Sequence, residues 1–284
     1  MTTHMIDQIV ERVGTLPPLP DTILRLVRVV SDADSSLSQI VEAVRYDQVL
    51  TAEVLRLCNS AYFGLVRRVE SLDDAVCLLG TVRVFQLVMA GHARAALGRP
   101  QGGYGLRAGA LWQHSVGVAL GSQVLARRLH LTQMGLPFTG GLLHDVGKVV
   151  LNEFVAAEYA EIVRCVNEQR LSFVEAEQQV LGFTHAEVGA RLAESWSLPG
   201  SIVHCVRWHH EPDAAETAGP LTDAVHLADA VCLLLGIGGG DDGLLYRGHP
   251  AVLARHGLSQ ADLETVGAEV VAELRAVQTL FVPK

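Results

Sequence analysis

Seven histidine and aspartate residues stand in contexts that could bind metal ions. In chain order they are His114, His144, Asp145, His185, His209, His210 and Asp229. A carboxylate next to a histidine can act as a shared ligand, because its two oxygens can bridge two cations. Neutral imidazoles fill the remaining positions, and such a mixed set favours Fe, Mn, Ni or Zn over Mg or Ca. We therefore expect one or two divalent transition-metal ions per chain.

Lys148 lies three residues after Asp145, on the same side of an expected helix. From there its ammonium group could meet an oxygen atom of a bound phosphate. An ordinary cation near a helix end is the alternative interpretation. If the site is that of an enzyme, Asp145 and Lys148 are the residues that we expect to be catalytic.

The other histidines lack this context, and we interpret them as surface residues or as core residues with satisfied hydrogen bonds. They are His4, His92, His130, His204, His226, His249 and His256. His226 lies one helical turn before Asp229, where it could orient that carboxylate. Glu211 could support the histidine pair in the same way, and an exposed loop acid is the alternative.

Helices must position these ligands, because nearly every ordered stretch has helical periodicity and two-residue alternation is absent. We expect a helix from Asp21 and further helices at about 72–79, 82–97, 108–130, 137–152, 155–170, 172–181, 184–196, 199–210, 221–236 and 259–280. Each long helix would supply one or two ligands from its inward face. The sequence therefore predicts an all-α protein.

Three residue pairs have the spacing of a helix N-cap: Ser36 with Gln39, Ser71 with Asp74, and Thr184 with Glu187. The third pair predicts a helix whose first turn contains His185. The Pro-rich stretch 16–20 predicts an extended lead-in, because proline is excluded from helix interiors. Gly80 is expected to end the helix 72–79.

The segment Gly98-Arg-Pro-Gln-Gly-Gly-Tyr-Gly105 is the most glycine-rich stretch of the first half. We place a boundary there between two tandem helical bundles, residues 1–104 and residues 105–284. The second bundle would carry the metal ligands. The segment itself is expected to be the preferred site of proteolysis.

The composition favours a soluble protein of the cytoplasm. Hydrophobic residues make up 49% of the 284 residues, enough for a packed core. No apolar run reaches the roughly 18–20 residues of a membrane span, and residues 1–10 do not resemble a signal peptide. The net charge of −9 disfavours nucleic-acid binding. The five cysteines show no metal-binding or redox spacing and indicate a reducing compartment.

The order of the seven ligands resembles the pattern H…HD…H…H(H)…D of the HD superfamily of metal-dependent phosphohydrolases. The run His144-Asp-Val-Gly-Lys148 resembles the HDxGK element of that superfamily. The resemblance implies two ligand groups that share one aspartate. They are His114, His144, Asp145 and Asp229 on one side, and Asp145, His185, His209 and His210 on the other.

Further segments are similar to the HDOD family, the HD-related output domains. They are Leu16-Pro-Pro-Leu-Pro20, Asp47-Gln-Val-Leu-Thr51, Leu55-Arg-Leu-Cys-Asn-Ser60, Ala75-Val-Cys-Leu-Leu-Gly80, His185-Ala-Glu-Val-Gly189, Trp196-Ser-Leu-Pro199 and His209-His-Glu-Pro212. The similarity covers roughly residues 10–235. It implies a bacterial signalling protein in which the first bundle, lying against the HD-like bundle, forms a surface for a signalling partner.

Two functions remain open. The first is a regulatory output module that acts through a protein or a small ligand such as a nucleotide. The second is a two-metal phosphohydrolase of a nucleotide or cyclic nucleotide. The complete ligand set favours the enzyme. The module is favoured by two departures from the HD-GYP cyclic-di-GMP phosphodiesterases: Glu211 is followed by Pro-Asp-Ala-Ala-Glu-Thr instead of a GYP element, and Ala110 replaces a glutamate that often precedes their first histidine.

Overall fold

The computed structural model describes residues 21–31, 39, 42, 44, 47–60, 63–65, 67–133, 135–213, 219–243 and 249–281. Over these residues the regular elements are helices, and the only extended pairing is an isolated bridge between Gln101 and Leu106. The all-α prediction is therefore confirmed. The predicted lead-in at residues 16–20 and the predicted N-cap Ser36 lie outside the described residues.

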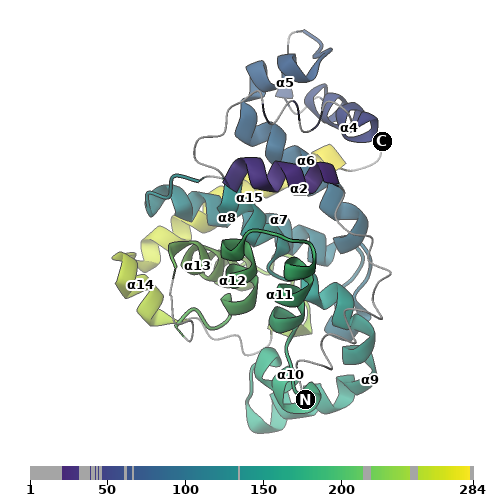
Figure 1. Ribbon diagram of the computed structural model, residues 1–284. Coiled ribbons are helices and arrows are strands. Elements are labelled where there is room, and N and C mark those ends of the chain that lie inside the picture. The colour runs from purple at the N-terminus through teal and green to yellow at the C-terminus, as the bar shows by residue number, and fades with distance from the viewer. Residues whose placement is uncertain are drawn as a thin grey trace.

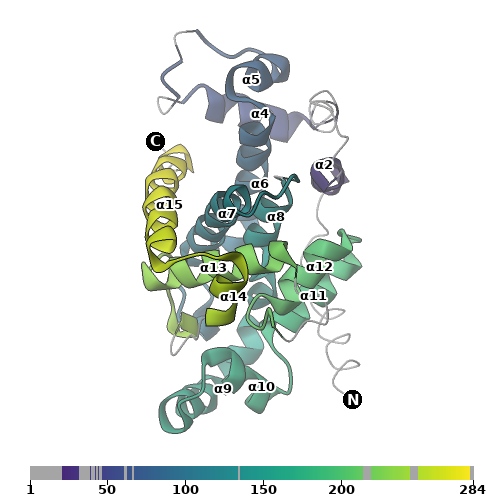
Figure 2. The same ribbon diagram turned by 90° about the vertical axis from the view of Figure 1, so that its left-hand side faces the viewer.

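Helices α4 and α5 lie at one end of the molecule, and α9 and α10 lie at the other end (Figures 1 and 2). In chain order the elements are α2 (Asp21–Ser31), α4 (Gln48–Cys58), α5 (Leu72–Leu79), α6 (Thr81–Leu97), η2 (Gly102–Tyr104), α7 (Ala110–Arg128), α8 (Gly135–Leu143), α9 (Val146–Gln169), α10 (Phe173–Leu181), α11 (His185–Ser195), α12 (Gly200–Trp208), α13 (Pro220–Leu234), η3 (Asp241–Gly243), α14 (Pro250–His256) and α15 (Gln260–Phe281). Helices α4 and α14 were not among the expected helices.

Helix α7 forms the centre of the molecule and is buried along most of its length. It packs against α8, α13 and α15. Two glycines let α13 and α15 approach closely: a β-carbon at Gly117 would lie 3.2 Å from Sγ of Cys232, and one at Gly121 would lie 3.0 Å from Cβ of Ala228. This contact brings the inward face of α7 next to the inward face of α13.

The chain between residues 137 and 170 folds differently from the prediction. We expected helices at 137–152 and 155–170, but the break lies at His144 and Asp145, between α8 and α9. Asp145 is the N-cap of α9 with φ −99° and ψ 11°. Nothing interrupts α9 near Asn152, whose side chain instead accepts a hydrogen bond from the backbone N–H of Gly103 at 3.0 Å. The His–Asp pair therefore lies at a helix junction.

The glycine-rich segment 98–105 packs against α9 through its buried residues, whereas Arg99, Pro100, Gly102 and Gly105 are exposed. Gln101 and Tyr104 are buried, and a β-carbon at Gly103 would overlap the backbone oxygen of Asn152. A protease needs an accessible, locally unfolded substrate, and the expectation of preferred cleavage here stays a prediction. Helix α2, from the first half, packs on α8 from the second. The division at residue 104 stays a prediction.

The predicted helix ends agree with the structure where it describes them. Oγ of Ser71 accepts a hydrogen bond from the N–H of Asp74 at 3.0 Å, at the start of α5. Thr184 and Glu187 form a capping box that starts α11 at His185. Gly80 ends α5 with a φ of +78°, which favours glycine.

Across the described part of the chain, no single helix is both long enough and apolar enough to cross a membrane. The bent pair α5–α6 meets that test only when its two helices, 116° apart, are counted together.

Candidate metal centre

The seven predicted ligands converge at one place in the fold. His114 comes from α7, His144 and Asp145 from the junction of α8 and α9, His185 from the first turn of α11, His209 and His210 from the turn after α12, and Asp229 from α13. Six of them are buried and His210 is partly exposed. Segments that are far apart in the sequence thus form one cluster.

One oxygen of Asp145, Oδ2, faces the first ligand group. It lies 3.2 Å from Nε2 of His144 and 3.7 Å from Nε2 of His114. Nε2 of His114 is also 3.0 Å from Oδ1 of Asp229. The ammonium of Lys148, in the first turn of α9, contacts the same Oδ2 at 2.5 Å. Lys148, which we expected to meet a phosphate oxygen, is thus bound to Asp145.

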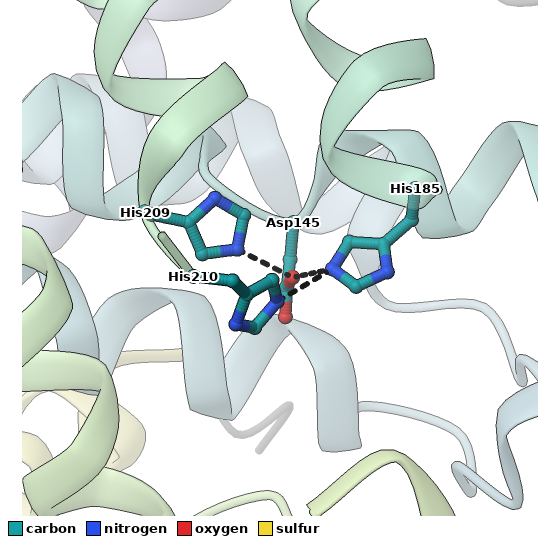
Figure 3. A group of neighbouring side chains, drawn as sticks. All are labelled: Asp145, His185, His209 and His210. Atoms are coloured by element: carbon teal, nitrogen blue, oxygen red, sulfur yellow. Dashed lines mark hydrogen bonds and ion pairs between the residues drawn. The ribbon is translucent and has the colours of Figure 1, made fainter. Parts of the chain in front are cut away.

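The other oxygen of Asp145, Oδ1, faces the second group (Figure 3). It lies 3.3 Å from Nε2 of His185 and 3.7 Å from Nε2 of His209. Nε2 of His210 is 2.9 Å from Nε2 of His185, so both rings present the same kind of atom to one point. Asp145 therefore lies between the two groups, as its place in the sequence pattern predicted.

Backbone carbonyls orient three of the imidazole rings. Nδ1 of His114 lies 3.0 Å from the oxygen of Ile237, Nδ1 of His144 lies 2.7 Å from that of Gly141, and Nδ1 of His209 lies 2.8 Å from that of Val206. Since a carbonyl only accepts, each Nδ1 carries the proton and donates it. Nε2 is then the atom directed at the carboxylates. Metal-binding histidines in proteins are oriented in the same way, because one ring N–H donates to a carbonyl or carboxylate and the other nitrogen binds the ion.

Burial keeps two rings of the second group, His209 and His210, uncharged. It lowers the pKa of His209 to about 3 and also lowers the pKa of His210, so both rings are neutral near pH 7. Burial alone would raise the pKa of Asp145, but His144 and Lys148 outweigh it and hold that pKa well below its usual range. Neutral imidazoles beside an ionised carboxylate are the forms that bind a cation.

Four buried atoms in the centre have no hydrogen-bond partner. They are Nε2 of His144, Oδ1 of Asp145, Nε2 of His209 and Oδ2 of Asp229. An unsatisfied buried polar atom costs about 1–3 kcal/mol. Lone pairs of imidazole and carboxylate gathered in this way fit a divalent transition-metal ion. The residues present therefore fit the ion that the HD pattern implies.

Glu177 and Tyr104 also belong to the centre, although the sequence analysis did not identify them. The buried carboxylate of Glu177 accepts hydrogen bonds from Nδ1 of His185 at 2.7 Å and from the backbone N–H of His185 at 3.1 Å. Its other oxygen accepts one from the hydroxyl of Tyr104 at 2.7 Å. Although burial alone lowers the pKa of His185, Glu177 and Asp145 outweigh it and raise that pKa to about 9.

We expect Glu177→Gln to lower the affinity for a divalent metal about 10- to 100-fold, the usual effect of losing a carboxylate behind a histidine ligand. Glutamine keeps the shape but removes the charge that holds the His185 ring. Tyr104→Phe is the matched control, because it removes one hydrogen bond to Glu177 and leaves the carboxylate; its effect should be smaller. Competition titration with a fluorescent chelator measures both. Equal affinity in Glu177→Gln and the wild type would contradict this role.

His226 contacts the backbone of the histidine pair, and its role in orienting Asp229 stays a prediction. Its Nδ1 donates to the backbone oxygen of His209 at 2.8 Å, and its Nε2 accepts from the N–H of His249 at 3.1 Å. Glu211 is exposed, which favours the interpretation as a loop acid.

Comparison with known proteins identifies relatives. The HDOD domain model matches residues 16–212. An HDOD domain protein of unknown function from Geobacter sulfurreducens is 30% identical with a TM-score of 0.72, and the match covers 99% of this chain and 100% of that one. A candidate phosphohydrolase from Shewanella amazonensis SB2B is 27% identical with a TM-score of 0.66, covering 96% and 97% of the two chains.

A curated relative is an uncharacterized protein of Treponema pallidum (strain Nichols), which is 28% identical over 234 residues. The match covers 80% of this chain but only 44% of that protein. The chain thus spans less than half the length of this relative.

Proposed function

Because this chain belongs to the HDOD domain family, we propose that it is a regulatory output module of bacterial signal transduction whose buried centre binds a divalent transition-metal ion. It acts through contact with a signalling protein or through a small ligand such as a nucleotide. In this proposal the helices up to residue 104 contribute the partner surface, and residues 105–284 contain the centre. The protein works in the cytoplasm and binds neither membranes nor nucleic acid.

The burial of the His–Asp cluster is the observation that best supports this proposal. His114, His144 and Asp145 are each at most 3% exposed. A phosphodiester substrate needs an accessible site with groups that hold its phosphate and bases. The cationic group beside this centre, Lys148, is itself buried and bound to Asp145. A site of this kind is better suited to structure or sensing than to turnover.

Exposed apolar side chains support contact with a protein partner. Val49 of α4 is 76% exposed, and Leu78 of α5 and Val82 of α6 are 41% and 46% exposed. Helices α4, α5 and α6 contact one another, and α4 and α5 lie at the end of the molecule opposite α9 and α10 (Figure 1). Large exposed apolar side chains are candidates for contact with a partner.

The residues that would hold metal are the two predicted groups, which share Asp145: His114, His144, Asp145 and Asp229, and Asp145, His185, His209 and His210. Their ligand atoms cluster in the structure as His114, His144 and Asp229, and as Asp145, His185, His209 and His210. When bound, divalent ions supply Lewis acidity toward a phosphoryl oxygen. That property supports the second candidate function, a phosphohydrolase of a nucleotide or cyclic nucleotide. The observation in its favour is the complete ligand set. In that case the catalytic residues would be Asp145, which faces both groups, and Lys148, which would have to leave Asp145 to bind a phosphate.

We expect the Mn- or Fe-loaded protein to hydrolyse cyclic-di-GMP little or not at all. The net charge of −9 repels an anionic dinucleotide, and the chain lacks the GYP element after Glu211. The assay incubates the loaded protein with cyclic-di-GMP and follows the linear product by chromatography. Turnover that disappears in Asp145→Ala would show that the module proposal is wrong and that the protein is an enzyme.

A further inference from the structure

We propose that two copies of this chain associate through an apolar groove between α13 and α15, with the two α15 helices antiparallel. Helices α13 and α15 pack against each other (Figure 2), and the groove runs along their junction. It lies beyond residue 212, where the match to the HDOD model ends. None of the described residues that line it belongs to the His–Asp cluster or to α4, α5 and α6. Association of this kind is separate from the proposed function and does not depend on metal binding.

The groove has a volume of about 730 Å³ and mostly apolar walls. One wall is formed by Leu234 and Leu235 at the end of α13, and the other by Leu263, Gly267 and Val271 of α15. Leu234 is 85% exposed, more than any other large hydrophobic side chain among the described residues, and Leu235 is 48% exposed. Burying a leucine side chain contributes about 1.5–3 kcal/mol. Two neighbouring exposed leucines beside an apolar groove therefore favour a protein partner that covers both.

Small residues allow a second helix to lie close to α15. Ala268 and Ala272 are one helical turn apart on the groove face, and both are exposed. Neither side chain extends beyond Cβ, so the axis of a packed helix can approach to the lower end of the usual range of about 8–10 Å. The partner helix must be equally narrow at its centre, and α15 itself meets that requirement.

The charged residues of this face are complementary to a second copy of α15. Glu264 and Arg275 line the groove, are exposed, and lie eleven residues apart. Three helical turns take about 10.8 residues, so both residues lie on nearly the same side of α15, about 16.5 Å apart along its axis. Neither forms an ion pair with another residue in the part of the chain that the structure describes. Each therefore offers its charge to a partner.

A two-fold axis fixes how the two helices are arranged. When they run antiparallel about a point between residues 269 and 270, Glu264 of each copy lies opposite Arg275 of the other. Ala268 then lies opposite Val271. Each favourable pair occurs twice, because such an interface uses the same patch on both copies. A parallel pair would instead place Glu264 against Glu264 and Arg275 against Arg275. The charges therefore favour the antiparallel homodimer.

The experiment measures association by sedimentation velocity over a range of protein concentrations. We expect the wild type to dimerise with a dissociation constant of about 1–10 µM. Reversing one charge, in Glu264→Arg or Arg275→Glu, puts like charges opposite each other at two places and should weaken association about tenfold. The double variant Glu264→Arg/Arg275→Glu restores both pairs with exchanged signs and should associate within about threefold of the wild type. It also keeps the net charge of the wild type, so a general effect of charge does not explain its recovery.

A further variant tests the apolar part of the interface. Leu234→Ser is expected to weaken association about tenfold or more, because each dimer loses two buried leucines. Its side chain is mostly exposed in the single chain, so the fold should be unaffected, and circular dichroism checks this. Arg164→Glu is the control for charge reversal. Arg164 lies on α9, is half exposed and does not line the groove, so its reversal should leave the dissociation constant unchanged.

A wild type that stays monomeric up to about 100 µM would overturn the inference and leave the groove to an occupant of a different kind. A dimer that the single charge reversals leave unchanged, or that the double reversal does not restore, would also overturn it, because the interface would then lie elsewhere. None of these results depends on whether the His–Asp cluster binds metal, so failure here is distinguishable from failure of the proposed function.

Discussion

Replacing Asp145 with alanine is expected to abolish metal binding at the centre. Asp145 is the carboxylate that faces both ligand groups, through Oδ1 toward His185 and through Oδ2 toward His144. Without it, the remaining side chains are mostly neutral imidazoles, which hold a divalent ion far less tightly than a set that includes a bridging carboxylate. Metal analysis after reconstitution with Mn, Fe or Zn should therefore find no ion above background.

The same substitution is expected to lower stability. It removes the carboxylate that contacts Lys148 inside the protein, and breaking a buried ion pair typically costs about 3–5 kcal/mol. Urea unfolding measures this loss, and circular dichroism shows whether the helices remain. Asp213→Ala is the control, since Asp213 is partly exposed, pairs with Arg255 and lies outside the cluster. Full metal content in Asp145→Ala would place the metal elsewhere in the protein.

Gly147→Ala is expected to cost at least about 3 kcal/mol, at or beyond the upper end of the usual penalty for overpacking. A β-carbon at Gly147 would overlap the backbone oxygen of His185 and lie 2.7 Å from the backbone nitrogen of Gly189. Backbone atoms cannot rotate away as side chains can, so α9 and α11 would have to separate. A loss of this size is a large part of the roughly 5–15 kcal/mol that stabilises a typical domain.

Separation of these helices would also pull Asp145 away from His185, so the affinity for metal should fall along with stability. Urea unfolding and metal titration measure the two effects on the same preparation. Gly200→Ala is the matched control, because a β-carbon there meets no atom within 4 Å. Its stability should be that of the wild type or slightly higher. A Gly147→Ala protein within about 0.5 kcal/mol of the wild type, the range of an ordinary surface substitution, would contradict the close crossing.

The sequence predicted the class of fold because helical periodicity and capping residues act locally. The capping box of Thr184 and Glu187 started α11 at the expected residue and so placed His185 in its first turn. The break between α8 and α9 was missed because α8 is buried on every side. It therefore has no polar face whose periodicity could mark its end.

The seven histidine and aspartate residues of the cluster were also predicted from the sequence, because they follow a recognisable spaced pattern. Their role as metal ligands stays a prediction. Glu177 and Tyr104 were not found, because neither is part of a motif. Glu177 stands in an ordinary amphipathic helix, and Tyr104 in a stretch that composition marks as a loop. Only the packing of η2 on α9 brings the tyrosine hydroxyl to the glutamate.

The hydrogen-bond chain from Tyr104 through Glu177 to His185 has a thermodynamic consequence for ligand and partner binding. Tyr104 lies in the connection between α6 and α7, so the placement of that connection and the orientation of His185 depend on each other. An ion that favours one orientation of His185 favours one placement of the connection. A partner that binds α6 and shifts this connection therefore changes the affinity of the protein for the ion. By thermodynamic linkage, the ion changes the affinity of the protein for that partner by the same factor.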